Sequence, residues 1–125
     1  MAASSTSLHE DPEKLNSDTI DRHRAIVSLM EELEAVDWYD QRIDAASDDA
    51  LRQILTHNRD EEKEHAAMVM EWLRRHDEAL DRQLRNYLFT GDDIAERAAR
   101  LEEEGESEAK SDGSLGIGSL RAARP

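Results

Sequence analysis

Apolar residues recur through residues 17–46 at alternating steps of four and three, the spacing of a helix face that packs in a bundle. A polar break at residues 47–49 offers good N-cap residues, and a second stripe with similar spacing follows over residues 51–76. The pattern therefore predicts two long helices that form an antiparallel hairpin. The first stripe comprises Ala25, Leu29, Glu32, Val36, Tyr39 and Ile43, and the second comprises Leu51, Leu55, Asn58, Glu62, His65, Val69, Trp72 and His76.

The rest of the chain is less regular. Apolar positions at Leu80, Leu84, Tyr87 and Leu88 predict a short third helix that ends near Gly91. The predicted organisation is a mobile arm at 1–16, the hairpin with the third helix at 17–91, a charged and flexible linker at 92–113 and a C-terminal segment at 114–125. Within the linker, helix is expected over 94–104 at most, because Ser, Gly and Lys follow from Gly105 onward.

The charge of the chain limits its partners. Thirty acidic residues against 16 basic ones give a formal net charge of −14, which disfavours nucleic acid and anionic membrane surfaces and favours cations. The sequence has no cysteine, as expected for a protein of the reducing cytoplasm, and no apolar run long enough for a secretory signal or a membrane-spanning helix. The chain is therefore expected to be a cytoplasmic protein that binds neither nucleic acid nor membrane.

Three ionisable residues, Glu32, Glu62 and His65, occupy stripe positions where apolar residues are expected. An unpaired carboxylate at such a position is costly, and neither stripe offers a Lys or Arg at the same level. A metal ion would supply the missing positive charge. The alternative interpretation is a solvated acidic helix face, which is common in a chain this rich in Glu.

Helix geometry places these residues opposite one another. Measured from Ser47, Glu32 lies fifteen residues before the turn and Glu62 fifteen after it, so both are roughly 22 Å from the bend. In ferritin-like di-iron proteins two helices each contribute a Glu and two others a Glu-x-x-His, and this chain has one helix of each kind. The sequence therefore predicts an all-α hairpin with a short third helix that dimerises into a ferritin-like four-helix bundle.

The ligand types indicate the metal. Carboxylates with one imidazole and no thiolate suit iron, with calcium, manganese or zinc as possible substitutes. Two chains would surround two ions with four Glu and two His, and the four negative charges would balance two ferrous ions. This arithmetic favours a ferroxidase that uses oxygen or peroxide to convert Fe2+ to Fe3+. The alternatives are a non-enzymatic acidic adaptor, a divalent-cation buffer, or a rubrerythrin-like peroxidase that would lack its usual cysteine cluster.

Residues around the triad of Glu32, Glu62 and His65 give weaker evidence of a functional role. Glu31 and Glu34 beside Trp38 are either an ordinary exposed acidic stretch or an access route and secondary metal site. Tyr39 is either part of the core or a hydrogen-bond partner of a metal ligand. Leu115, Ile117 and Leu120 are isolated apolar residues beyond the expected linker, a pattern suited to docking in the groove of another protein.

Segments 30–42, 57–68 and 71–75 strongly resemble the encapsulated ferritins, and the resemblance covers residues 20–90. It implies that a dimer completes the ferroxidase centre and that dimers form an open ring of ten chains. Glu32, Glu62 and His65 would be the iron ligands, Tyr39 would support them, and Glu31, Glu34 and Trp38 would belong to the access route or a secondary site.

The C-terminal segment carries a second resemblance. Residues 114–120 are similar to the targeting peptide by which such cargo docks inside an encapsulin shell, with Leu115, Ile117 and Leu120 as the contacts. The resemblance implies that the protein resides in an encapsulin nanocompartment of the cytoplasm, whose shell would store the oxidised iron. The extension at 121–125 departs from the pattern of that peptide.

Overall fold

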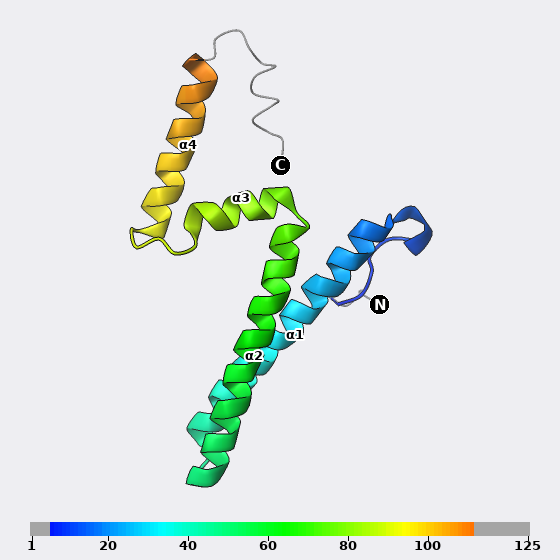
Figure 1. Cartoon of the computed structure of the whole chain (residues 1–125), viewed down its shortest axis with the longest axis vertical. Helices are drawn as coiled ribbons and strands as arrows, with labels where there is room; N and C mark the ends of the chain where they lie inside the picture. The colour runs from blue at the N-terminus through cyan, green and yellow to red at the C-terminus, as the bar shows by residue number, and fades with distance from the viewer. Residues whose placement is uncertain (1–5, 112–125) are drawn as a thin grey trace. The chain divides into compact units, whose positions relative to one another are not determined.

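The computed structural model describes residues 6–111, and all regular structure in that range is helical (Figure 1). A 3-10 turn, η1, and four α-helices follow one another, which confirms the predicted all-α class. Their bounds are Pro12–Lys14 for η1, Ser17–Ala45 for α1, Asp49–Arg75 for α2, Glu78–Tyr87 for α3 and Ile94–Ser111 for α4. No helix within these described residues is long and apolar enough to cross a membrane.

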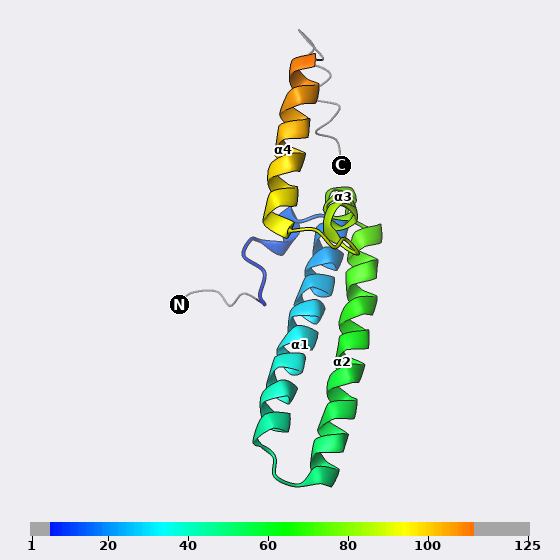
Figure 2. The same ribbon diagram turned by 90° about the vertical axis from the view of Figure 1, so that its left-hand side faces the viewer.

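Helices α1 and α2 form the predicted antiparallel hairpin and lie side by side along most of their length (Figure 2). Each starts at a side chain that accepts a hydrogen bond from the first turn: Asn16 from the Thr19 amide at 2.9 Å, and Asp48 from the Leu51 amide at 2.8 Å. These caps satisfy amide groups that a helix start leaves without partners. The polar break at 47–49 therefore ends one helix and begins the next.

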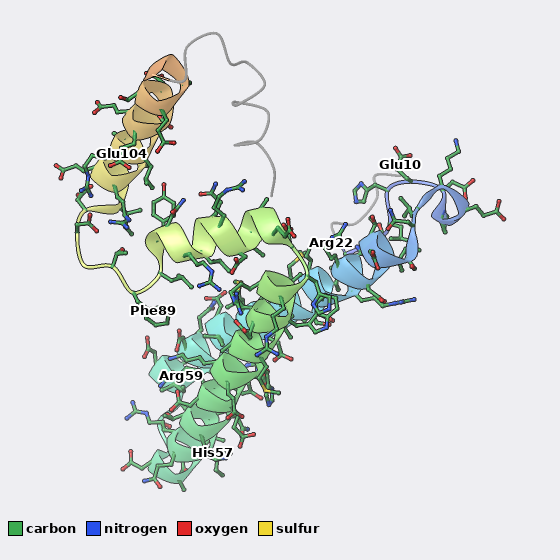
Figure 3. All side chains as sticks on the ribbon, turned by 45° about the horizontal axis from the view of Figure 1, so that its top comes forward. Glu10, Arg22, His57, Arg59, Phe89 and Glu104 are labelled. Atoms are coloured by element: carbon green, nitrogen blue, oxygen red, sulfur yellow. The ribbon has the colours of Figure 1, made fainter. Side chains whose placement is uncertain are left out.

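Two arginines of α2 connect it to α1. Arg52 donates from Nε to the carbonyl of Ala46 at 2.7 Å, which closes the turn. Arg59, labelled in Figure 3, contacts the Asp40 carboxylate through Nη1 at 3.0 Å. Because the Arg59 side chain is about three-quarters covered, this link between the helices is better shielded than an ordinary surface ion pair.

Burial follows the predicted stripes, but the core of the hairpin is thin. All six residues of the first stripe are half-buried, as are most of the second, whereas Leu51 and His76 at the ends of the second are exposed. Among the described residues only Ala66 and Leu73 are buried. Two helices can cover only one face of each other, so large apolar side chains remain in contact with solvent. On the hairpin these are Ile26, Met30, Leu33, Trp38, Leu51, Ile54 and Met68.

The chain divides into two compact units after His76, so α3 groups with α4, whereas the sequence-based organisation placed it with the hairpin. Asp77 begins α3 by accepting a hydrogen bond from the Leu80 amide at 2.9 Å. The helix ends at Tyr87, two residues before Phe89, which has φ 61° and a fully exposed side chain (Figure 3). A left-handed residue after a helix C-cap is common, although glycine usually fills it.

Helix α4 extends further than the sequence indicated. We expected helix at most to residue 104 and a flexible linker from Gly105, but α4 continues to Ser111. Glu, Ala and Arg dominate this segment and favour helix, while one interior glycine costs only about 1 kcal/mol relative to alanine. The expected arm at 1–16 likewise contains the η1 turn, which Asp11 caps by accepting from the Glu13 amide at 3.0 Å.

Candidate metal centre

The hairpin brings Glu32 of α1 together with Glu62 and His65 of α2. One ligand atom from each residue lies within 4.8 Å of the other two. The Nδ1 atom of His65 is 3.6 Å from Oε2 of Glu32 and 3.5 Å from Oε2 of Glu62. The equal distance of the two Glu residues from the turn thus corresponds to a real juxtaposition, and the i,i+3 spacing places His65 on the same side of α2 as Glu62.

Burial and the neighbouring carboxylates shift the pKa values of Glu32 and His65. The pKa of Glu32 is raised above its usual value, first by its hydrogen bond with Glu62, then by burial and the negative charge of Glu62. Burial lowers the pKa of the His65 imidazole, but the hydrogen bonds and charges of Glu62 and Glu32 outweigh that effect and raise it overall. A carboxyl group whose pKa is raised by a neighbouring carboxylate marks a site that favours a cation.

Among the ion pairs of residues 6–111, His65 is the only basic residue that contacts Glu32 or Glu62. Neither Glu32 nor Glu62 forms an ion pair with a lysine or arginine within residues 6–111. A divalent ion would neutralise both carboxylates and take the ring-nitrogen lone pair of His65 as a third ligand. Three protein ligands leave coordination positions open on an ion such as Fe2+, so the donor set of one chain fits a metal and is incomplete.

The neighbouring candidates lie on α1 but outside this cluster. Glu31 and Glu34 are exposed, Trp38 is 48% exposed and Tyr39 is half-buried. The only group of three or more potential ligands found within the described range is Glu32, Glu62 and His65, so the structure of one chain does not bring Glu31 and Glu34 into a metal cluster. The proposed docking residues Leu115, Ile117 and Leu120 lie outside the described residues.

Sequence reasoning missed one residue near these candidates. The guanidinium carbon of Arg42 lies 5.5 Å from the ring centroid of Tyr39 and 5.9 Å from that of Trp38. Both distances are within the range of cation–π attraction. The spacing in the sequence indicates this contact, because residues three and four apart on a helix are neighbours.

Comparison with known proteins agrees with the all-α fold. The family model described as EncFtn-like matches residues 7–91. An encapsulated ferritin-like protein of Rhodospirillum rubrum is 58% identical over 137 aligned residues, which cover 100% of this chain and 98% of the relative. A ferritin-like protein of Thermotoga maritima is 50% identical over 114 residues, covering 90% of this chain and 96% of the relative.

A solved structure has a similar fold over most of the chain. The crystal structure of a protein from Nitrosomonas europaea is similar with a TM-score of 0.69 and 58% sequence identity. The similarity covers 70% of this chain and 97% of that one. At this identity the likeness extends beyond the general topology to the sequence that forms the helices.

Proposed function

Because this chain belongs to the EncFtn-like family, we propose that it is a ferroxidase that oxidises Fe2+ to Fe3+ at a two-ion site built by two copies of the chain. The observation that carries the proposal is the triad of Glu32, Glu62 and His65, whose ligand atoms lie within 4.8 Å of one another. The ferritin-like names of the relatives support iron as the metal.

The exposed apolar surface of the hairpin supports a second copy as the missing partner. Leu33, one residue after Glu32, is 53% exposed, and Ile54 on α2 is 57% exposed. Covering such side chains is favourable by roughly 25 cal/mol per Å². A two-fold pairing presents the same face of both chains to each other, so it would bring the two triads together while it covers this surface.

Each residue of the triad would have a separate task. The carboxylates of Glu32 and Glu62 would bind the ions and stabilise Fe3+ more than Fe2+, since the oxidised ions carry more positive charge. The imidazole of His65 would bind through a deprotonated ring nitrogen. Two Fe2+ ions lose one electron each, and O2 takes both electrons with two protons to form hydrogen peroxide. With peroxide as oxidant, the same two electrons and two protons give two water molecules.

Oxygen uptake after addition of ferrous iron tests this assignment. We expect Glu32→Ala and His65→Ala to lose most of the activity, because each removes a ligand from both ions of a pair. Glu64→Gln is the matched control, since Glu64 is an exposed residue of α2 outside the triad. Turnover in the Glu32 and His65 variants at the rate of the unmodified protein would refute the site.

The same measurements separate a ferroxidase from a passive metal-binding protein. A divalent-cation buffer or adaptor would retain iron when purified without chelator but would consume no oxygen. Sedimentation in the presence and absence of metal tests the dimer and the expected ring of ten chains. A protein that stays monomeric with metal at all concentrations would contradict the shared site.

The candidates next to the triad have a proposed role in supplying iron. Glu31 and Glu34 are exposed acidic residues on α1 within one turn of Glu32, and Trp38 follows one turn later. We expect Glu31→Gln combined with Glu34→Gln to slow iron oxidation at low iron concentration and to leave the rate at saturating iron nearly unchanged. An equal loss at all concentrations would place these residues in the centre itself. For Tyr39, proposed to support a ligand, Tyr39→Phe tests the hydroxyl alone.

The encapsulated relative supports a proposal about location. Residues 114–120 would dock the protein inside an encapsulin shell, which would retain the ferric product. Removing 114–125 should leave oxygen uptake intact and abolish co-purification with co-expressed shell protein. Retained co-purification would refute docking through Leu115, Ile117 and Leu120.

A further inference from the structure

Arg42 lies over two aromatic rings in a chain that offers many carboxylates. Its guanidinium carbon is 5.5 Å from the Tyr39 ring centroid and 5.9 Å from that of Trp38. The acidic residues that precede it on α1 have other partners, because Asp37 accepts from Gln41 at 3.3 Å and Asp40 pairs with Arg59. No ion pair of Arg42 occurs among those found in residues 6–111. The contact with the rings is therefore the main interaction of this charge.

We propose that Arg42 protects the Trp38 and Tyr39 rings, because its charge makes them harder to oxidise while iron is oxidised nearby. A cation over the face of a ring is attracted to its π electrons. Loss of a ring electron turns that attraction into repulsion between two positive charges, so the oxidised ring is destabilised. The inference rests on the proposed ferroxidase activity only for the source of the oxidant.

Both rings are at risk if the proposed chemistry takes place. Tyr39 follows Glu32 by seven residues in the same stripe, about 10 Å along the helix axis, and nearly half of Trp38 is exposed. Peroxide and Fe2+ react to give Fe3+, hydroxide and a hydroxyl radical. The radical takes one electron from the Trp38 indole and becomes hydroxide. The Nε1 proton of the oxidised indole then joins that hydroxide to give water, which leaves a neutral indolyl radical.

A metal-free experiment tests the effect of the charge directly. The chain has two tryptophans, so the oxidation of Trp38 can be measured against that of Trp72, which stacks on His76 away from Arg42. Full-length protein is illuminated with riboflavin, a one-electron photo-oxidant, and oxidised peptides are quantified by mass spectrometry. We expect Arg42→Gln to raise the ratio of Trp38 to Trp72 oxidation roughly two- to fivefold. Arg42→Lys, which keeps the charge, should restore much of the protection.

Acrylamide quenching of tryptophan fluorescence separates charge from simple shielding, since acrylamide is neutral and reports only access to the ring. The proposal expects more oxidation of Trp38 in Arg42→Gln with little change in quenching. An unchanged oxidation ratio would overturn it, and so would oxidation that rises only in step with quenching. Because no iron is present, these results do not depend on the ferroxidase proposal.

A second experiment follows the protein during iron turnover. Arg42→Gln should oxidise iron at the initial rate of the unmodified protein, because Arg42 is not a metal ligand. Over repeated additions of Fe2+ it should accumulate oxygen adducts on Trp38 and Tyr39 and lose activity sooner. Equal adduct levels in variant and unmodified protein, at equal iron turnover, would contradict protection by Arg42. Absence of turnover in both would instead refute the ferroxidase proposal.

Discussion

Replacing Glu62 by glutamine should change the stability of the protein in opposite directions with and without metal. In the metal-free protein, oxygen atoms of Glu32 and Glu62 lie within 4.8 Å of each other. Two like charges at that separation repel by about 1 kcal/mol even when water screens them fully. Glu62→Gln removes this repulsion and lets the amide donate to Glu32. We therefore expect the metal-free variant to be about 1 kcal/mol more stable.

Metal should reverse this order, because it binds the folded unmodified protein through the two carboxylates. At a free metal concentration one hundred times Kd, binding adds about 2.7 kcal/mol per site. The variant lacks one ligand and one negative charge, so metal binding should stabilise it much less. The unmodified protein should then become the more stable of the two by more than 1 kcal/mol.

Thermal unfolding followed by circular dichroism measures both effects at one protein concentration. Samples at one fixed pH contain either a chelator or Mn2+, which avoids the oxidation of ferrous iron. A change of about 1 kcal/mol corresponds to a shift of roughly 4–8 °C in a unit of this size. Glu64→Gln serves as the charge-matched control and should respond to Mn2+ as the unmodified protein does. The reasoning would be refuted if Glu62→Gln were less stable than the unmodified protein in chelator. It would also be refuted if Mn2+ stabilised both proteins equally.

Three further predictions concern stability in the metal-free protein. Leu73 is only 4% exposed, so Leu73→Ala should cost about 2–5 kcal/mol in urea unfolding, whereas Met68→Ala, at a site 65% exposed, should cost much less. The pKa of His65 is raised from 6.5, so its stabilising effect should be complete below pH 6.5 and lost as pH rises through the higher folded-state pKa; His65→Gln should flatten this dependence. Arg74 and Arg75 lower the pKa of Glu71 from 4.5 to about 2. The stabilising effect of Glu71 should therefore be complete above pH 4.5 and lost as the pH falls toward 2, and Glu71→Gln should not show this loss of stability in acid unfolding.

The hairpin and the triad were predictable because both follow from helix periodicity. The stripe that contains Glu32 is half-buried at all six of its positions, as a helix face that packs on a neighbour should be. A single turn joins the helices, so counting residues from residue 47 was enough to place Glu32 opposite Glu62. Local caps at Asn16 and Asp48 set the helix starts, and both depend only on residues close in sequence.

Features that depend on competition between weak preferences were harder to predict. The end of α4 is one case, since Gly105 disfavours helix while the surrounding Glu and Ala residues favour it, and the sum of many small propensities decided the outcome. The partner of Arg42 is another. Whether an arginine contacts a carboxylate or an aromatic ring depends on which acidic side chains are already paired, and that information lies in the side-chain arrangement.

The incomplete site and the thin core of the hairpin have a common physical origin. Two helices bury one face of each other, and here that shared face carries Glu32, Glu62 and His65 in positions that apolar residues would otherwise fill. Placing ligands on this face reduces the buried apolar surface of the hairpin, which is already small. Only Ala66 and Leu73 are buried in the described part of the chain. A second copy would supply both the missing ligands and the missing apolar contacts. If the proposed pairing is correct, the stability of this protein and its affinity for iron must therefore depend on each other, and each should depend on protein concentration.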